Sequence, residues 1–202
     1  VVGVVGLHDA ALGNRQILAR VEAILDAVRK QGDRAVLRFT KRFDRLNLKA
    51  SELKVPQEWI KEAYQKLKPE QIESLKYAAD RIAAFHARQR QTTWTYEEDG
   101  ITLGQMVRPL ATVGLYVPGG KASYPSSVLM NAIPAKIAGV ERVVIASPTP
   151  GGELNPALLV AANLAGVHEI YRVGGAQAIG AMAFGTETIP KVDKIVGPGN
   201  QY

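Results

Sequence analysis

The chain has 202 residues and a formal net charge of +6, with 47% hydrophobic and 22% charged residues. This length allows one large or two small domains with a buried core, in a protein of ordinary globular composition. Because the basic residues are neither clustered nor interleaved with aromatic residues, and no apolar run approaches ~20 residues, we expect neither a nucleic-acid partner nor a membrane span. The absence of cysteine excludes disulfides and thiolate chemistry and fits a reducing cytoplasm, the compartment we expect.

Helical patterns dominate the first ninety residues. Apolar residues recur at three- and four-residue steps from Asn14 to Gly32, which predicts a helix with one buried stripe and Asn14 as its N-cap. A second, shorter helix is predicted to follow from Asp33. A third should begin at Pro56, and a longer one should run from Pro69 to about Gln89, with a short strand at 53–55 before the third helix.

The pattern then changes from helices to strands. Residues 92–108 flank Asp99-Gly100, a preferred two-residue turn, and predict a β-hairpin. From residue 110 onwards, apolar strands alternate with helices long enough to return the chain, which predicts a parallel sheet covered on both faces. We expect strands at 112–117, 142–147, 169–173 and 194–196, and helices at 123–138, 155–165 and 176–184.

The predicted fold is therefore α/β. An N-terminal helical region with a hairpin would occupy residues 1–104, and a Rossmann-like domain would occupy residues 105–202. Because the chain stops directly after a glycine turn, where a doubly wound domain normally continues into a helix, we expect the Rossmann-like sheet to be incomplete at its C-terminal end.

Three predicted strands run into glycine turns, which end in Pro118-Gly119-Gly120, Gly174-Gly175 and Gly197-Pro198-Gly199. A glycine turn before a helix lets backbone N–H groups approach a phosphate. The Gly-x-Gly-x-x-Gly fingerprint of dinucleotide sites is absent from all three turns, and each alone is better explained as a simple connection. Three turns at one sheet edge favour a nucleotide site.

Several side chains beside these turns are candidates for ligand contacts. Tyr116 is placed to stack on an adenine or nicotinamide ring, or to pack on the next helix. Gln177 is placed to hydrogen-bond a ribose or an amide, or to be an ordinary residue of a first helical turn. Lys121 is a candidate phosphate partner, although solvated lysines are commoner, and Asn200 fits either a ligand contact or a turn. His8, His86 and His168 lack metal-ligand spacing.

Four long stretches have a specific sequence, at residues 113–120, 124–130, 174–178 and 184–200, and residues 32–44 and 85–89 support them upstream. Together they resemble histidinol dehydrogenases. The resemblance implies oxidation of L-histidinol through histidinal to L-histidine, with NAD as the oxidant. It also implies a variant Rossmann-like NAD domain, a zinc ion that holds the substrate, and a homodimer. On this match Tyr116, Gln177 and Asn200 fall on NAD-contacting positions.

In that family the zinc ligands and a Glu-His acid–base pair come from the second half of a longer chain. We therefore expect no catalytic residue and no metal ligand up to Tyr202, and we expect these 202 residues alone to be inactive. Two other hypotheses stay open. One is a stand-alone nucleotide-binding module without catalysis. The other is an interaction protein whose basic N-terminal helices bind an acidic partner.

Overall fold

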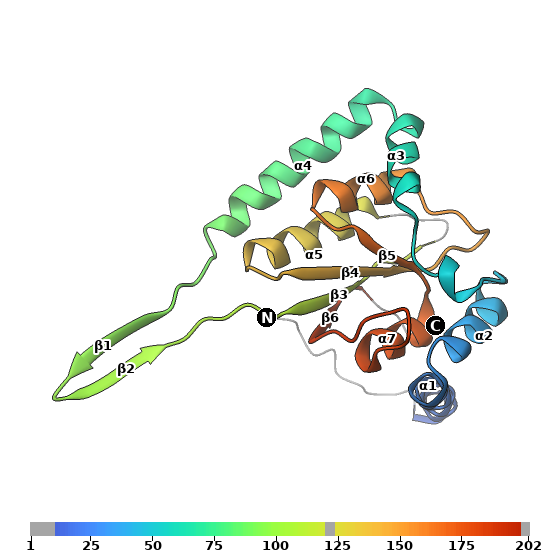
Figure 1. Cartoon of the computed structure of the whole chain (residues 1–202), viewed down its shortest axis with the longest axis horizontal. Coiled ribbons are helices and arrows are strands. Elements are labelled where there is room, and N and C mark those ends of the chain that lie inside the picture. The colour runs from blue at the N-terminus through green and yellow to red at the C-terminus, as the bar shows by residue number, and fades with distance from the viewer. Residues whose placement is uncertain (1–10, 120–123, 199–202) are drawn as a thin grey trace.

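The computed structural model describes residues 11–119 and 124–198. Figure 1 shows a layered α/β body from which one hairpin projects. In chain order, the elements are α1 (Ala11–Gln31), α2 (Asp33–Phe43), η1 (Ala50–Glu52), α3 (Gln57–Lys66), α4 (Pro69–Ala87), β1 (Trp94–Glu98), β2 (Ile101–Gln105), β3 (Thr112–Tyr116), α5 (Pro125–Ile137), β4 (Arg142–Ser147), α6 (Pro156–Leu164), β5 (Glu169–Arg172), α7 (Gly175–Phe184) and β6 (Lys194–Val196).

The central sheet is parallel, and its strand order is β5-β4-β3-β6. Strand β3 lies between β4, where Val113 pairs with Val143, and β6, where Gly114 pairs with Ile195. The chain therefore moves outward from β3 through β4 to β5 and then returns to the other side of β3. In open α/β sheets, ligands bind at the carboxyl ends of the strands beside such a reversal. That position is occupied here by the end of β3.

Helices cover both faces of this sheet, as the uninterrupted runs of Val and Ile predicted. On one face, Val113 and Leu115 of β3 belong to a core shared with α3, α4, α5 and α6. On the other face, Val144 and Ala146 of β4 join a core shared with α1, α2 and α7. The α/β class is thus confirmed. The division into regions 1–104 and 105–202 stays a prediction, because the N-terminal helices pack directly on the helices that flank the sheet.

Two local predictions were wrong. Helix α1 begins at Ala11, so Asn14 lies inside it and is not its N-cap; the good helix formers Ala11 and Leu12 extend the helix past that position. The segment 53–55 forms only an isolated bridge, between Lys54 and Tyr171, because its flanking residues turn away into η1 and α3.

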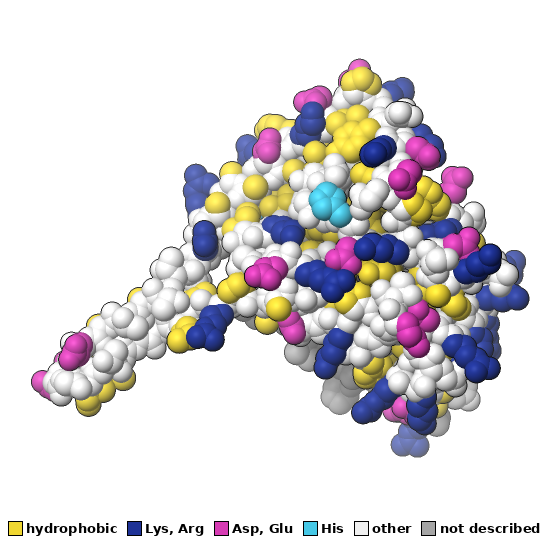
Figure 2. All heavy atoms as spheres, in the orientation of Figure 1, with side chains coloured by type: hydrophobic (Ala, Val, Ile, Leu, Met, Phe, Trp, Pro, Cys, Tyr) yellow, Lys and Arg dark blue, Asp and Glu magenta, His cyan; other side chains and the backbone are white. Residues whose placement is uncertain are grey.

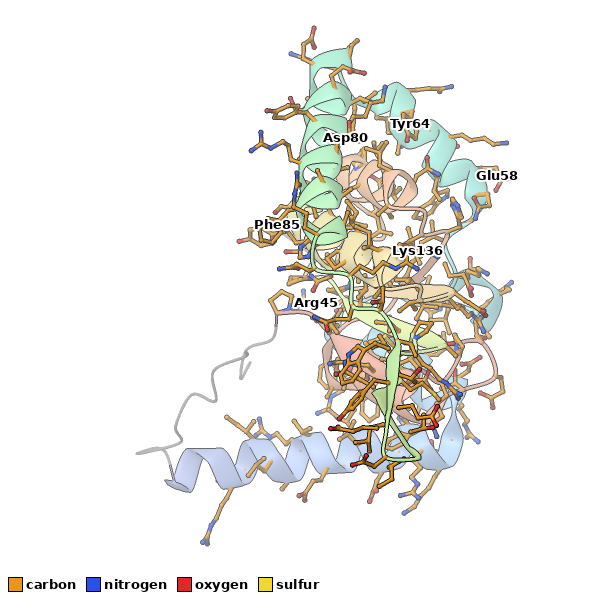
Figure 3. All side chains as sticks on the ribbon, turned by 90° about the vertical axis from the view of Figure 1, so that its left-hand side faces the viewer. Arg45, Glu58, Tyr64, Asp80, Phe85 and Lys136 are labelled. Atoms are coloured by element: carbon orange, nitrogen blue, oxygen red, sulfur yellow. The ribbon has the colours of Figure 1, made fainter. Side chains whose placement is uncertain are left out.

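The predicted stripe of α1 is buried only in its second half. Val28 is buried in the core with α7, whereas Ile17 and Leu18 are 37% and 57% exposed. Figure 3 shows the reason, because the first turns of α1 extend beyond the body of the molecule.

The β1–β2 hairpin is confirmed. Asp99 and Gly100 both have positive φ, at 51° and 75°, as a type I′ turn requires. Among the residues that the structure describes, no helix is both long enough and apolar enough to cross a membrane.

Candidate functional site

The carboxyl ends of the parallel strands meet in closely packed turns. Glycine is required where these turns touch, since a Cβ on Gly119 or Gly174 would clash with Pro148, which follows β4. A Cβ on Gly197, after β6, would clash with the carbonyl oxygen of Tyr116. These glycines therefore hold the strand ends together, and they bring the side chains around them to one edge of the sheet.

Tyr116 links the end of β3 to the beginning of α7. Its hydroxyl oxygen accepts a hydrogen bond from the backbone N–H of Gly175, at 3.2 Å. That N–H is among the first-turn donors that a helix cannot satisfy internally. The ring is half-buried and packs against the core that contains α7. Tyr116 thus packs on the core that contains α7 and also accepts a hydrogen bond from that helix, while its stacking on a ligand ring stays a prediction.

Gln177 lies beneath the same turn and is 1% exposed. Its side chain folds back so far that a Cβ on Gly175 would lie 2.8 Å from Gln177 Oε1, and Gly175 has a φ of 62°. Neither Oε1 nor Nε2 has a hydrogen-bond partner within the described residues. Because buried polar atoms are nearly always paired, this amide is the outstanding polar group of the edge. Tyr116 and Gln177 therefore meet at Gly175.

The third predicted contact, Asn200, lies outside the described residues, and so does the candidate Lys121. The assignment of Tyr116, Gln177 and Asn200 to a cofactor stays a prediction. Among the three, Tyr116 and Gln177 lie at the predicted edge of the sheet.

A polar cluster on the other face of the same edge was missed by the sequence reasoning. Arg172, at the end of β5, is 8% exposed, and its guanidinium lies 4.8 Å from the centre of the Trp59 ring. Its Nη2 donates to the carbonyl oxygen of Gly152 at 2.6 Å. Burial lowers the pKa of Arg172, and the nearby charge of Glu52 raises it. The available signal was a charged residue between the apolar residues Tyr171 and Val173 of the predicted strand, since a buried charge rarely occurs without a partner.

Two hydroxyl groups accompany Arg172. Ser147 is its register partner on β4, and Thr149 follows two residues later. The Ser147 Oγ, the Thr149 Oγ1 and the Arg172 Nε are buried, with no hydrogen-bond partner among the described residues. The carboxyl edge therefore holds unpaired polar atoms near both faces of the sheet.

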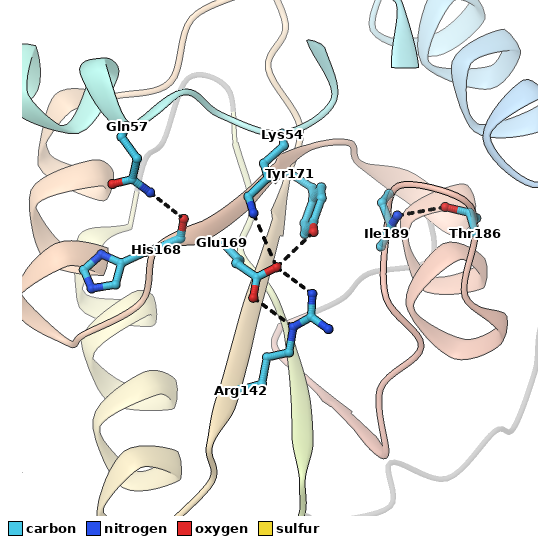
Figure 4. A network of polar contacts seen from close by, with 8 residues as sticks. All are labelled: Lys54, Gln57, Arg142, His168, Glu169, Tyr171, Thr186 and Ile189. Carbon is cyan, nitrogen blue, oxygen red and sulfur yellow. Dashed lines mark hydrogen bonds and ion pairs between the residues drawn. The ribbon is translucent and has the colours of Figure 1, made fainter. Parts of the chain in front are cut away.

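The opposite end of the sheet carries a compact ion-pair network (Figure 4). Arg142 donates two hydrogen bonds to Glu169, both at 2.8 Å, and Lys54 lies 3.6 Å from the same carboxylate. The hydrogen bond from Arg142 holds the pKa of Glu169 below its usual value. Burial, helped by Glu169, raises the pKa of Tyr171 to about 12. These groups pair with each other at the beginnings of β4 and β5, so they secure the sheet and offer no free acid or base.

The described residues include no group of three His, Cys, Asp or Glu side chains that could hold a metal ion. The zinc implied by the resemblance therefore has no ligand set in residues 11–119 and 124–198.

Comparison with known proteins gives a consistent result. A family model described as histidinol dehydrogenase matches residues 8–202. The chain is 60% identical over 183 residues to a histidinol dehydrogenase of Syntrophotalea carbinolica, and 55% identical over 190 residues to one of Geobacter sulfurreducens. These alignments cover 90% and 93% of this chain but 42% and 44% of the relatives.

A solved structure agrees with this result. The crystal structure of histidinol dehydrogenase from Elizabethkingia anophelis superposes with a TM-score of 0.88 at 38% sequence identity, over 99% of this chain and 45% of that one. The present chain thus spans less than half the length of the proteins that it matches.

Proposed function

The chain belongs to the histidinol dehydrogenase family, and we propose that the carboxyl edge around Gly175 binds NAD for the oxidation of L-histidinol through histidinal to L-histidine. The observation that carries this proposal is the meeting of the Tyr116 hydroxyl and the unpaired Gln177 amide at the first residue of α7. The resemblance adds Asn200 as a third contact. The expected compartment is the cytoplasm.

The residues at this edge fit a dinucleotide. The half-buried ring of Tyr116 offers an aromatic face for a base or a nicotinamide, and its hydroxyl fixes the position of the α7 N-terminus. The Gln177 amide offers one acceptor and two donated hydrogens to a ribose or a carboxamide. Since Gln177 is enclosed, contact with the cofactor requires the residues that cover it to move apart. When bound, NAD supplies the acceptor for a hydride.

Zinc has no fitting ligand set in the described residues, so we assign no step to it in this chain. By resemblance, the zinc ligands, most contacts with the substrate L-histidinol and the acid–base pair come from the part of the family's longer chain that this chain does not match. We propose, again by resemblance, that the protein acts as a homodimer.

The test is a calorimetric titration of the purified 202-residue chain with NAD. We expect saturable binding with an affinity that falls about tenfold in the Tyr116→Ala variant. The affinity should be unchanged in Tyr77→Ala, which removes an exposed tyrosine of α4. Absence of NAD binding by the folded chain would refute the proposal.

A second assay tests whether the chain catalyses the reaction or only binds the cofactor. We expect NAD binding without histidinol-dependent formation of NADH, because the 202 residues should bind the nucleotide and be inactive alone. Formation of NADH from histidinol by the verified 202-residue chain would refute the expectation of inactivity.

A further inference from the structure

Arg172 is a buried cation without an anionic partner in the described fold. On the face shown in Figure 2, Lys and Arg side chains lie at the surface beside Asp and Glu. Arg172 is only 8% exposed, and no ion pair joins it to a carboxylate within residues 11–119 and 124–198. The nearby carboxylate of Glu52 is exposed and accepts a hydrogen bond from the backbone N–H of Lys49, at 2.7 Å. Buried charges are rare without a partner, so this one requires an explanation.

The groups that contact the guanidinium are neutral. The centre of the Trp59 ring lies 4.8 Å from it, and the carbonyl oxygen of Gly152 accepts from its Nη2 at 2.6 Å. A ring face and a carbonyl dipole attract a cation but leave its charge in place. Burial lowers the pKa of Arg172, and the charge of Glu52 opposes this only in part. The positive charge therefore remains without a counter-ion.

A buried hydroxyl group lies beside the guanidinium on the same face of the sheet. Ser147 of β4 pairs in register with Arg172 of β5. Each follows by two positions an isoleucine, Ile145 or Ile170, of the core that contains α3, α4, α5 and α6. Side chains two positions apart share a face of a strand, so Ser147 and Arg172 both point to that side. Tyr116 packs on the opposite core, which separates this group from the candidate NAD contacts.

A tight turn brings a second hydroxyl to the same place. The backbone N–H of Gly152 donates to the carbonyl oxygen of Thr149 at 2.8 Å, and Gly152 in turn accepts from Arg172. Ser147 and Thr149 are both fully buried. The Ser147 Oγ, the Thr149 Oγ1 and the Arg172 Nε all lack a hydrogen-bond partner in the part of the chain that the structure describes.

These three groups have the chemistry of an anion site. Two hydroxyls and an Nε–H supply three hydrogen-bond donors beside one uncompensated positive charge. Arginine and hydroxyl side chains are the donors by which proteins commonly bind phosphate oxygens. A water molecule pairs with hydroxyls but does not neutralise a buried cation. An oxyanion does both.

We propose that Arg172, Ser147 and Thr149 form a binding site for an oxyanion of the phosphate class, on the face of the sheet away from Tyr116. The anion accepts hydrogen bonds from the Nε–H and the two hydroxyls, and its negative charge offsets that of the guanidinium. Free phosphate and the phosphate group of a nucleotide both supply this chemistry. The inference does not rest on the proposed binding of NAD.

Trp59 marks the route to the site. Its half-buried ring covers the guanidinium and also lines a cavity of about 210 Å³ between α3 and the start of α6. The charged side chains of this cavity, Glu62, Lys66 and Glu153, are exposed. A shift of the Trp59 ring therefore opens Arg172 to a cavity that reaches solvent.

The same tryptophan makes binding measurable. The chain contains two tryptophans, Trp59 and Trp94, so Trp94→Phe in the exposed hairpin leaves Trp59 as the single fluorescent indole. This chain is titrated with sodium phosphate, and sodium chloride of equal ionic strength is the control. We expect a saturable change in fluorescence with phosphate alone. The urea midpoint should also rise with phosphate, because a ligand that binds only the folded chain stabilises it.

Four substitutions test the three donors. Ser147→Ala and Thr149→Val keep most of the side-chain volume, and each should raise the phosphate Kd at least about tenfold, because a hydrogen bond to a charged ligand is lost. Without phosphate, neither should lower the urea midpoint, since each removes an unpaired buried hydroxyl. Arg172→Met should abolish saturable binding. Arg34→Met removes an exposed arginine of α2 and should leave the Kd nearly unchanged, because surface charges are screened.

A response to phosphate no larger than that to chloride would overturn the inference and would indicate a site for water alone. Binding that survives Arg172→Met would also overturn it. A parallel titration with NAD identifies the source of the anion. Competition between NAD and phosphate, with both weakened by Ser147→Ala, would assign the site to a phosphate of the nucleotide, whereas simultaneous binding would assign it to free phosphate. Phosphate binding without NAD binding would refute the proposed function alone, and NAD binding without a phosphate response would refute this inference alone.

Discussion

Replacing Gln177 with Met separates stability from cofactor binding at the candidate site. Gln177 is 1% exposed, and neither of its amide atoms is paired within the described residues. A buried polar atom without a partner costs about 1–3 kcal/mol. Met is close to Gln in length and removes both polar atoms, so the free energy of unfolding should rise in the absence of NAD.

The magnitude follows from two opposing terms. Removal of two unpaired atoms contributes at least about 2 kcal/mol, and an imperfect fit of the new side chain costs up to about 1.5 kcal/mol. We expect a net gain of at least about 0.5 kcal/mol. In a chain of this size each kcal/mol shifts the Tm by about 2–4 °C. NAD affinity should fall about fivefold or more, because about 1 kcal/mol is lost for each hydrogen bond that the amide makes to the cofactor.

Urea unfolding without NAD and calorimetric titration with NAD measure the two effects. Gln65→Met is the matched control, since Gln65 is exposed on α3 and should change stability by less than about 0.5 kcal/mol. If Gln177→Met destabilised the chain by more than 1 kcal/mol, the amide would have a partner inside the protein and our reasoning would fail. Unchanged NAD affinity would remove Gln177 from the binding site.

Three further substitutions test the surrounding structure. Tyr116→Phe keeps the ring and removes the acceptor of the Gly175 N–H. Calorimetry should show an NAD affinity within about threefold of wild type for Tyr116→Phe, and about tenfold weaker for Tyr116→Ala. Equal losses in the two variants would refute a stacking role for the ring. Asp33→Ala removes the carboxylate that accepts hydrogen bonds from the Oγ1–H and backbone N–H of Thr188. Urea unfolding should show that the free energy of unfolding falls by about 2–4 kcal/mol, and Asp33→Asn should restore part of it. A decrease under about 1 kcal/mol would contradict this role. Arg142→Met should move acid unfolding, followed by circular dichroism, to higher pH. Arg142 holds the pKa of Glu169 below its usual 4.5, so the carboxylate stabilises the fold above that pH and loses this effect as the pH falls through its lowered pKa. An unchanged midpoint would show that the pair adds nothing to stability.

Local patterns in the sequence predicted most of the elements. The strand Arg142–Ser147 has the predicted bounds, because an uninterrupted apolar run between turn residues is typical of a strand buried on both faces. Asp99-Gly100 predicted the hairpin, since these two residues readily adopt the positive φ of its turn. Such signals lie within a few residues of each other and need no tertiary information.

Contacts between distant residues could not be predicted in this way. Asp33 and Thr188 are 155 positions apart, and no local pattern around either residue predicts their hydrogen bonds. Arg172 stacks on Trp59 through a similar long-range approach. The prediction of Asn14 as an N-cap was wrong for a local reason. A good capping residue does not begin a helix when the residues before it also favour helix.

The glycine turns show why more of the fold than of the candidate site could be predicted from the sequence. In the sequence, Gly119, Gly174 and Gly197 suggested room for a phosphate. In the structure, each also allows the close approach of Pro148 or Tyr116 from a neighbouring strand end. The packing requires these glycines whether or not a ligand binds. They therefore indicate where the strand ends meet, but they do not identify a ligand. Substituting them would disturb the packing of the edge and could not isolate binding. The side chains of Tyr116 and Gln177 carry the chemical information, and their variants are the ones that test the proposed function.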